Sequence, residues 1–306
     1  MTASPHGKGS SPTAPPPLEV AFIGCGAVGR TLGRLWREAG ISVGGVCCTT
    51  AASAEEACRF IGAGTPAAGA EGIRAAARSA PVVVLAVPDD RIPPLAEQAA
   101  PALGPGRRVL HLSGALSSLV LAPCRERGAA VGSMHPLQSF PDPEAALGRV
   151  AGAFFACEGD PPALEAAFRL AEAAGGRPVR IETAVKPLYH AAAAAASNFM
   201  IPALTLAADL MEAAGFSREE GLAALRPLVL GTAEGACSLG VPRALTGPIE
   251  RGDVEVVRKH REEIARHAPA LLEGWRTLAR MTVEAARRKG SIDAAAARRL
   301  EEAVEG

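Results

Sequence analysis

The order of apolar and polar positions divides the chain into two regions. Between residues 18 and 182, short apolar runs rich in β-branched side chains alternate with amphipathic stretches. Such runs predict buried parallel strands, and the stretches between them predict helices. This alternation predicts an α/β domain with a doubly wound sheet. The strands are expected at 18–23, 41–48, 81–87, the first part of 108–115, 130–134, 153–157 and 178–181.

The pattern changes after Pro187, where runs with strand character end. The sequence therefore predicts an α/β domain over 18–182 and an all-helical domain over 183–306. Residues 1–17 are mainly Ser, Pro, Gly and Thr without an apolar segment, which predicts a disordered tail and no standard signal peptide. The alanine- and leucine-rich helices of the second region are expected at 188–214, 218–230, 253–267 and 270–289.

Side chains at the ends of the expected elements suggest how some helices begin. Ser53 is expected to cap a helix that runs to Ile61, with Glu56 completing a capping box. Asp89 and Asp90 follow a strand, and capping of the next helix is the role expected for them. The Gly/Ala-rich segment 62–80 is expected to be a loop with a short helix.

A glycine motif joins the first strand to the first helix. In a G-x-G-x-x-G turn, the first glycine makes the tight turn, the second lets the backbone approach a pyrophosphate, and the third lets helix and strand pack closely. The helix N-terminus then offers unpaired N–H groups to the phosphates. A strand before and a helix after the motif predict a Rossmann domain. The expected dinucleotide-binding residues are Gly24, Cys25, Gly26, Ala27, Val28 and Gly29.

The end of the second strand favours NADP over NAD. NAD sites commonly place an acidic residue about 20 positions beyond the glycines, where it binds the ribose hydroxyls. No Asp or Glu lies between Glu38 and Glu55, and small side chains before Thr49 leave room for a 2′-phosphate. Arg30 and Arg59 are candidate partners of that phosphate, with solvated helix positions as the alternative.

Other strand ends supply the rest of the expected site. Because the carboxyl ends of parallel strands line the ligand crevice, Val87, Pro88 and Ser113 are expected beside the cofactor. His135 follows another strand and is expected to bind the substrate. Capping of a turn is the alternative for Ser113 and His135.

Candidate catalytic groups lie near the start of the helical region. Reduction by a nicotinamide needs an acid to protonate the product and donors that polarise the substrate. Pro187 suits a first helical turn, so Lys186, one of only four lysines among 32 basic side chains, stands at the helix start. Lys186 is a candidate acid if burial lowers its pKa, with a solvated lysine as the alternative, and His190 is the rival acid. Asn198 is expected to orient the substrate, an interhelical hydrogen bond being its alternative.

A polar loop between two later helices offers a site for a carboxylate. Thr246 and Arg251 are expected to hold a substrate carboxylate, Arg251 through two parallel hydrogen bonds. Asp253 is expected to cap the following helix or to pair with Arg251.

Composition excludes several other classes of function. The 32 basic side chains balance 32 acidic ones without a basic block, so neither nucleic acid nor an anionic membrane is an expected partner. Apolar stretches such as 81–87 and 191–196 are too short to span a bilayer. The seven cysteines are dispersed without metal-ligand spacing, which predicts no metal site and a reducing, cytoplasmic location.

Several motifs in a fixed order carry a family resemblance. They resemble the Rossmann-like oxidoreductases with a C-terminal helical domain of unknown function 2520, over everything after the tail. That family is similar in plan to pyrroline-carboxylate reductases, prephenate dehydrogenases and hydroxyisobutyrate-type dehydrogenases, which usually dimerise through their helices and react in an interdomain cleft. The motifs are G-C-G-A-V-G (24–29), A-V-P-D-D (86–90), H-L-S-G-A (111–115), S-M-H-P-L-Q-S-F (133–140), Y-H-A-A-A (189–193), S-N (197–198) and A-L-T-G-P-I-E-R-G-D (244–253).

The chain departs from these relatives at two places. Cys48 and Thr49 stand where relatives often have Ser-Arg, which weakens the expected phosphate contact. Residues 232–236 lack an Asn that relatives tend to have.

The residues and the resemblance together predict an NADP-dependent oxidoreductase. Its expected substrate is a small carboxylate-bearing keto acid, with ketopantoate as the candidate that some relatives suggest, or an imine. The resemblance also implies a homodimer formed through the helical domain. A module that binds NADP as a sensor or scaffold, without turnover, is the alternative.

Overall fold

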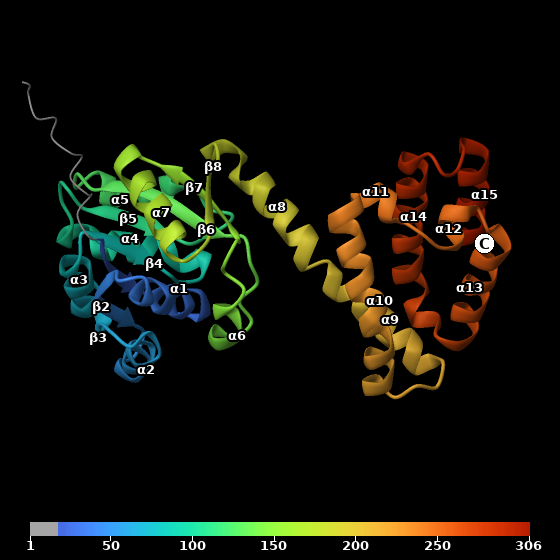
Figure 1. The fold of residues 1–306 in the computed structure, drawn as a ribbon, viewed down its shortest axis with the longest axis horizontal. Coiled ribbons are helices and arrows are strands. Elements are labelled where there is room, and N and C mark those ends of the chain that lie inside the picture. The colour runs from blue at the N-terminus through green and yellow to red at the C-terminus, as the bar shows by residue number, and fades with distance from the viewer. Residues whose placement is uncertain (1–17) are drawn as a thin grey trace, which may run out of the picture. The chain divides into compact units, whose positions relative to one another are not determined.

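The computed structural model describes residues 18–306, so the tail predicted at 1–17 lies outside the described residues. The chain divides into two compact units, the first ending at Ala194 and the second beginning at Ala195 (Figure 1). This division lies within a helix, twelve residues beyond the domain boundary expected at 182.

The first unit is built on one eight-stranded sheet with the order β3-β2-β1-β4-β5-β6-β7-β8. All neighbouring strands are parallel except β6 and β7, which run antiparallel. Helices cover both faces of this sheet, so the predicted doubly wound α/β architecture is confirmed (Figure 1). The strands are β1 (Glu19–Ile23), β2 (Ser42–Cys48), β3 (Thr65–Ala68), β4 (Val82–Leu85), β5 (Arg108–His111), β6 (Ala130–Pro136), β7 (Phe154–Gly159) and β8 (Arg177–Arg180).

The core of the first unit lies on the two faces of the sheet. Helices α1 and α7 pack on one face, where Trp36 stacks on Phe22 and its indole N–H donates to the Leu170 carbonyl oxygen over 2.8 Å. Helices α3 and α4 cover the other face. The helices of this unit are α1 (Ala27–Glu38), α2 (Ala51–Ile61), α3 (Gly69–Ser79), α4 (Ile92–Ala99), α5 (Ala122–Arg125), α6 (Pro143–Leu147) and α7 (Pro161–Ala173).

The second unit is helical, as the sequence predicts. Helices α13, α14 and α15 share a core, to which Val257, Val283 and Leu300 contribute. Helix α8 begins in the first unit and crosses the division. The helices are α8 (Lys186–Ser197), α9 (Met200–Ala213), α10 (Arg218–Leu239), α11 (Val241–Ala244), α12 (Pro248–Arg251), α13 (Val254–His267), α14 (Leu272–Lys289) and α15 (Ala294–Glu305).

Two expectations about helix bounds are wrong. The single helix expected over 188–214 is interrupted at Asn198 and Phe199. Pro202 explains the break, because a proline ring inside a helix clashes with the carbonyl four residues earlier, here that of Asn198. Helix α2 begins earlier than expected, since the Thr50 side chain caps it by accepting from the backbone N–H of Ser53.

The segment 62–80 and the two aspartates are the other corrections. The segment contains the edge strand β3 and the eleven-residue helix α3 rather than a loop with a short helix. Asp89 and Asp90 make no capping hydrogen bond, because they form a 3₁₀ turn that leads directly into α4.

One apolar helical run is longer than the stretches 81–87 and 191–196, which are by themselves too short to span a bilayer. Residues 183–213 form a run of 31 residues, helical apart from the turn at Asn198 and Phe199, and contain a window with mean hydropathy 1.5, of which 6% is buried. By length and composition alone this run matches a membrane-spanning helix, although it includes Lys186, His190 and the interruption at Asn198. This run contains the stretch 191–196 and is longer than the apolar stretches named above, while the expected absence of a membrane partner stays a prediction.

Candidate functional site

The glycine loop between β1 and α1 has the geometry that its sequence predicts. Gly24 adopts φ +76°, and a Cβ there would lie 2.0 Å from Val87 Cγ1. A Cβ on Gly29 would lie 2.9 Å from Ala86 Cβ, so this glycine permits the close contact of α1 with the end of β4. Only a residue without a side chain fits either position.

Gly26 differs from the other two glycines because the space beside it is open. No heavy atom lies within 4 Å of the position that its Cβ would take. Gly26 precedes the first turn of α1, which carries no acidic residue. Backbone N–H groups at an open helix N-terminus suit a phosphate, so this loop fits the pyrophosphate of a dinucleotide.

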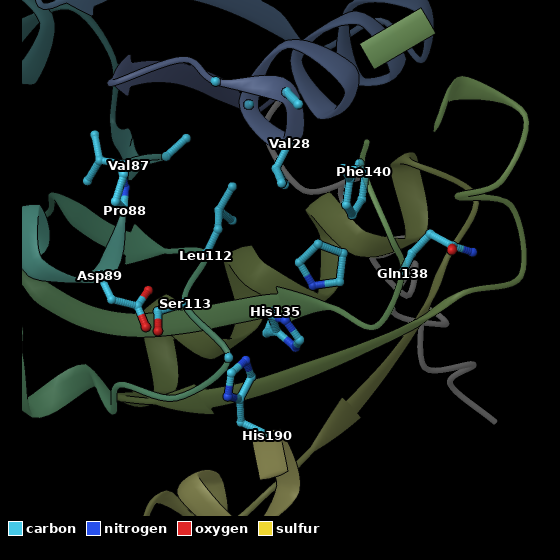
Figure 2. Close-up of a pocket in the computed structure, with 16 residues that line it drawn as sticks. Val28, Val87, Pro88, Asp89, Leu112, Ser113, His135, Gln138, Phe140 and His190 are labelled. Atoms are coloured by element: carbon cyan, nitrogen blue, oxygen red, sulfur yellow. The ribbon is translucent and has the colours of Figure 1, made fainter. Parts of the chain in front are cut away.

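A cavity of about 380 Å³ opens at the carboxyl ends of β1, β4, β5 and β6 (Figure 2). It lies entirely within the first unit. Ala27, Val28, Val87, Pro88 and Ser113, all expected to bind cofactor, line it together with two of the glycines. Its walls are formed by Gly26, Ala27, Val28, Gly29, Ala86, Val87, Pro88, Asp89, Leu112, Ser113, Gly114, His135, Pro136, Gln138, Phe140 and His190.

Apart from the glycines, two of the expected cofactor residues, Cys25 and Thr49, do not line the cavity. Cys25 is buried beneath the loop, and burial raises the pKa of its thiol above its usual range. Thr49 is exposed just after β2. Ser113 lines the cavity and also caps a turn, since its Oγ accepts from the backbone N–H groups of Ala115 and Leu116. Both roles proposed for Ser113 are therefore compatible with its position.

Two imidazole rings lie at one end of the cavity (Figure 2). His135, at the end of β6, and His190, on α8, contact each other edge to face with ring centroids 5.8 Å apart. Gly114 is essential to this arrangement, because a Cβ there would lie 2.4 Å from His190 Cδ2 and 2.8 Å from His135 Nε2. Tyr189 also contacts His135 edge to face, with ring centroids 5.6 Å apart, and the Tyr189 hydroxyl lies 2.9 Å from His135 Nδ1.

His135 is held neutral by its surroundings. Burial, with the charges of Lys186 and His190, lowers the pKa of His135 to about 4. Burial raises the pKa of Tyr189 to about 12, so its hydroxyl keeps its proton. When this hydroxyl donates to Nδ1, the imidazole carries its proton on Nε2, the nitrogen beside Gly114.

Lys186 lies behind this wall rather than on it. Its side chain is 0% exposed, and its Nζ donates to the Ser133 hydroxyl and lies 3.9 Å from Glu158 Oε1. Glu158 accepts from the Ser133 and Thr183 hydroxyls over 2.6 and 3.0 Å. It also accepts two hydrogen bonds from Ser118, one from the backbone N–H and one from the hydroxyl. The lysine is therefore an enclosed cation within a hydrogen-bonded network.

The register of the sheet places these groups in one row. Ser133 pairs with His111 across β5 and β6, and with Glu158 across β6 and β7. Burial lowers the pKa of Lys186 to about 8, although the charge of Glu158 opposes this effect. Burial acts to raise the pKa of Glu158, but hydrogen bonds from Ser133 and Ser118 and the charge of Lys186 hold it below its usual value.

His111 closes the row on the β5 side. It is 0% exposed, and its Nδ1 accepts from the backbone N–H of Ser113, while its Nε2 meets no hydrogen-bond partner among residues 18–306. Burial and the charge of Lys186 lower the pKa of His111 to about 3. This imidazole is therefore neutral across the physiological range.

The remaining expected residues belong to the second unit. Asn198 is exposed at the break between α8 and α9, and its side chain makes no hydrogen bond within the described part of the chain. Arg251 pairs with Asp253 over 2.9 Å, the second of the two roles foreseen for that aspartate. Thr246 lies in a loop that Lys289 holds by donating to the Leu245 carbonyl over 2.8 Å. Their convergence with the cavity stays a prediction.

Sequence reasoning missed the residues that support the two imidazoles. Tyr189 precedes His190 in the chain, and its phenol was a readable signal for a hydrogen-bonding partner. His111, Ser133 and Glu158 lie within strands and carry no local signal of their common position. No group of three or more His, Cys, Asp or Glu side chains within 18–306 has an arrangement that could hold a metal ion.

Comparison with protein families gives two matches. A Rossmann-like domain model matches residues 3–136, and the model of a domain of unknown function, DUF2520, matches residues 153–282. The chain therefore combines a Rossmann-like domain with a DUF2520 domain, the family organisation that its motifs predict. No curated protein matches the sequence.

Solved structures with the same fold cover almost the whole chain. Protein TM1727 from Thermotoga maritima is 28% identical, with a TM-score of 0.65 over 88% of this chain and 99% of that one. The proposed NADP oxidoreductase BF3122 from Bacteroides fragilis is 20% identical, with a TM-score of 0.71 over 88% and 98%. Pyrroline carboxylate reductase from Plasmodium falciparum, solved with NADP bound, is 12% identical, with a TM-score of 0.56 over 94% and 98%. At 20% and 12% identity, the last two matches show a common fold with this chain and nothing more.

Proposed function

We propose that this protein is an NADP(H)-dependent oxidoreductase that reduces a small carboxylate-bearing keto acid or an imine. The observation that carries the proposal is the cavity in which an open glycine loop meets His135 and His190. A dinucleotide held by the loop would supply the hydride. The donors at the other end are placed to act on the group that accepts it. The NADP named in the pyrroline carboxylate reductase structure agrees with this assignment.

His135 is assigned the polarising role. Its neutral ring carries the proton on Nε2 when Tyr189 donates to Nδ1, so Nε2–H can donate to a carbonyl oxygen or an imine nitrogen. A neutral imidazole of fixed tautomer stabilises charge that develops on that atom without first losing its own proton. Tyr189 acts through His135 and is a positioning residue.

His190, rather than Lys186, is assigned the proton transfer that completes the reduction. His190 lines the cavity, whereas Lys186 is sealed within the network of Ser133 and Glu158. Proton transfer needs a group within hydrogen-bond reach of the product. Lys186 instead acts at a distance, because its charge helps to keep His135 neutral.

The carboxylate of the substrate requires a cation from elsewhere in the chain. Asp89 is the only charged side chain that lines the cavity among the described residues. The sequence predicts that Arg251 and Thr246 hold this carboxylate and that Asn198 orients the substrate, and these roles stay predictions. Ketopantoate, other 2-keto acids and cyclic imines with a carboxylate are the substrates to test first.

We further infer that the protein works as a cytoplasmic homodimer formed through the second unit. Helices α9 and α10 expose large apolar side chains, including Ile201, which is 63% exposed, and Leu228, which is 66% exposed. The apolar run 183–213 fits this role better than a membrane span, because its part up to Ala194 belongs to the compact first unit. A second copy of the chain would cover the exposed part.

The test measures NADPH oxidation by the purified full chain against the panel of keto acids and cyclic imines. We expect turnover of one of them, and His135→Asn to lower kcat by about 10²–10³-fold. Tyr189→Phe should lower kcat by about 10-fold with little change in KM, since it disturbs only the tautomer of His135. His267→Asn, on an exposed helix end, is the matched control. Tight NADPH binding without turnover of any substrate would instead support the sensor or scaffold.

A further inference from the structure

A charged pair lies beside the glycine loop, outside the cavity described above. Arg30 directly follows Gly29 on α1, and its Nη1 donates to Glu56 Oε1 of α2 over 2.7 Å. Its Nε donates to the carbonyl oxygen of Cys25, within the loop, over 3.2 Å. These two bonds hold the guanidinium against the loop, while its Nη2 group makes no hydrogen bond to any residue of 18–306.

The pair stands at the end of β2. The backbone N–H of Gly24 donates to the Cys47 carbonyl over 2.7 Å, so the loop that the guanidinium contacts lies against the end of this strand. The charge of Arg30 also acts to lower the pKa of the Cys48 thiol, against the effect of burial. In dinucleotide-binding domains the end of the second strand meets the adenosine ribose, where NAD sites carry an acidic residue and NADP sites an arginine. This chain has neither residue at the strand end itself, which is Cys48 followed by Thr49.

We propose that Arg30 selects NADP(H) over NAD(H) by binding the 2′-phosphate, and that Glu56 is the resident anion which this phosphate displaces. The inference rests on the proposed function in taking the ligand to be a nicotinamide dinucleotide. An arginine supplied by the helix after the glycines thus replaces one supplied by the strand end. Its planar fork and free Nη2 group suit a phosphate.

The exchange of partners is energetically easy. The Glu56 side chain is 60% exposed, so it returns to water at little cost when the phosphate takes its place. An ion pair whose carboxylate is largely exposed contributes little to the stability of the fold. A phosphate carries more charge than a carboxylate, and its oxygens match the geometry of the guanidinium. NAD(H) carries no 2′-phosphate and leaves the pair of Arg30 and Glu56 intact.

Helix α1 provides a matched control one turn further on. Arg34 donates through its Nε to Glu38 Oε1 over 2.5 Å, and through its Nη1 to the Phe60 carbonyl over 3.0 Å. This second arginine has the same kind of partners as Arg30, a carboxylate and a backbone carbonyl. It lies a further turn away from the glycine loop, and it therefore tests whether any arginine on α1 has the same effect.

The experiment measures dissociation constants for NADPH and NADH by calorimetry with the full chain, which needs no substrate. Arg30→Ala should weaken NADPH binding by about 10–100-fold and NADH binding by less than about threefold, because it removes charge-assisted hydrogen bonds to the 2′-phosphate only. Glu56→Gln should tighten NADPH binding by about threefold, because the competing anion is removed. Arg34→Ala should change neither constant.

The outcomes separate this inference from the proposed function. Equal weakening of both dinucleotides by Arg30→Ala, or no weakening, would overturn the role of Arg30. Should Arg30→Ala fail to fold, Arg30→Lys keeps the charge without the fork and should give an intermediate loss for NADPH alone. Selective binding of NADPH without turnover of any substrate would support the role of Arg30 and contradict the proposed oxidoreductase activity. If the wild-type chain binds neither dinucleotide, both the role of Arg30 and the proposed function are wrong.

Discussion

The two compact units bury their apolar side chains to different extents. In the first unit both faces of the sheet are covered, and strands β1 and β4 are almost wholly buried. In the second unit α13, α14 and α15 share a core, but α9 and α10 bury only Ala208 and Gly221 between them. A stable helix usually buries an apolar face. The first unit is thus complete in itself, while half of the second carries a surface suited to a partner.

The largest effect is expected where that surface is given a charge. Ile201→Asp combined with Leu228→Asp should convert the proposed dimer into monomers at micromolar concentration, because each places an unpaired carboxylate in the interface. Light scattering after gel filtration measures the mass. Leu119→Asp in the first unit, where Leu119 is 59% exposed, should leave the mass unchanged.

Two results would contradict this account of the second unit. If the wild-type chain is monomeric at every concentration tested, the proposed homodimer is wrong. Co-flotation of the wild-type chain with lipid vesicles, abolished by Ile201→Asp, would assign the apolar run 183–213 to a membrane instead.

Among residues 18–306, each unit contains one lysine–glutamate ion pair, and the two pairs differ in burial. In the first unit, Glu158 and Lys186 are 1% and 0% exposed. Removing one partner of a buried pair leaves an uncompensated charge, so Glu158→Ala should destabilise the first unit by about 3–5 kcal/mol. Urea unfolding followed by the fluorescence of buried Trp36, in a Trp275→Phe background, measures the change.

A double variant identifies the cause of that loss. Glu158→Leu with Lys186→Met removes both charges together, and it should recover much of the stability lost by Glu158→Ala alone. If the double variant is as unstable as the sum of its single changes, the loss comes from packing and the hydrogen bonds of Ser133 and Ser118 rather than from the unpaired lysine.

Acid should weaken the first unit through its neutral histidines. Burial and Lys186 lower the pKa of His111 to about 3, whereas the unfolded chain takes up this proton near its ordinary value of 6.5. The unfolded state binds more protons in that window, so stability falls as pH falls from 6.5 toward about 3 and is unaffected above 6.5. His111 should contribute a slope of about 1.4 kcal/mol per pH unit.

Urea unfolding of the Trp275→Phe chain between about pH 7 and about pH 5 measures this slope. His111→Gln should reduce it by the contribution of one imidazole, whatever it does to the absolute stability. His267→Gln, at an exposed helix end, should leave the slope unchanged. An unchanged slope in His111→Gln would mean that His111 does not titrate as described.

Local features of the fold could be read from the sequence, and pairings between distant strands could not. The apolar runs identify β1 and β4, and the glycine spacing identifies the loop, because each depends on neighbours in the chain. Strand β3 has the sequence T-P-A-A and escapes such a reading, since its place at the edge comes from pairing with β2. The break before Pro202 was readable from the proline alone.

The same limit applies to the candidate site. His135 and His190 were identified because each stands at the end or start of an element that faces a crevice. The enclosure of Lys186 depends on the antiparallel pairing of Ser133 with Glu158, in a sheet whose other pairs are parallel. No local sequence pattern indicates that β6 and β7 run antiparallel. The resulting enclosure of Lys186 changes the role that we assign to it from proton donor to positioning residue.

The smallest effect is expected at the corresponding pair of the second unit. Lys289 and Glu250 lie 2.7 Å apart with side chains 22% and 20% exposed. Water screens this pair in part, so Glu250→Gln should cost about 1 kcal/mol or less, against about 3–5 kcal/mol for the buried pair. Hydrogen exchange of the backbone at 244–253 measures the local opening, because Lys289 also holds the Leu245 carbonyl there. A loss as large as that at Glu158 would mean that the loop of Thr246 and Arg251 is as rigidly built as the buried row of the first unit.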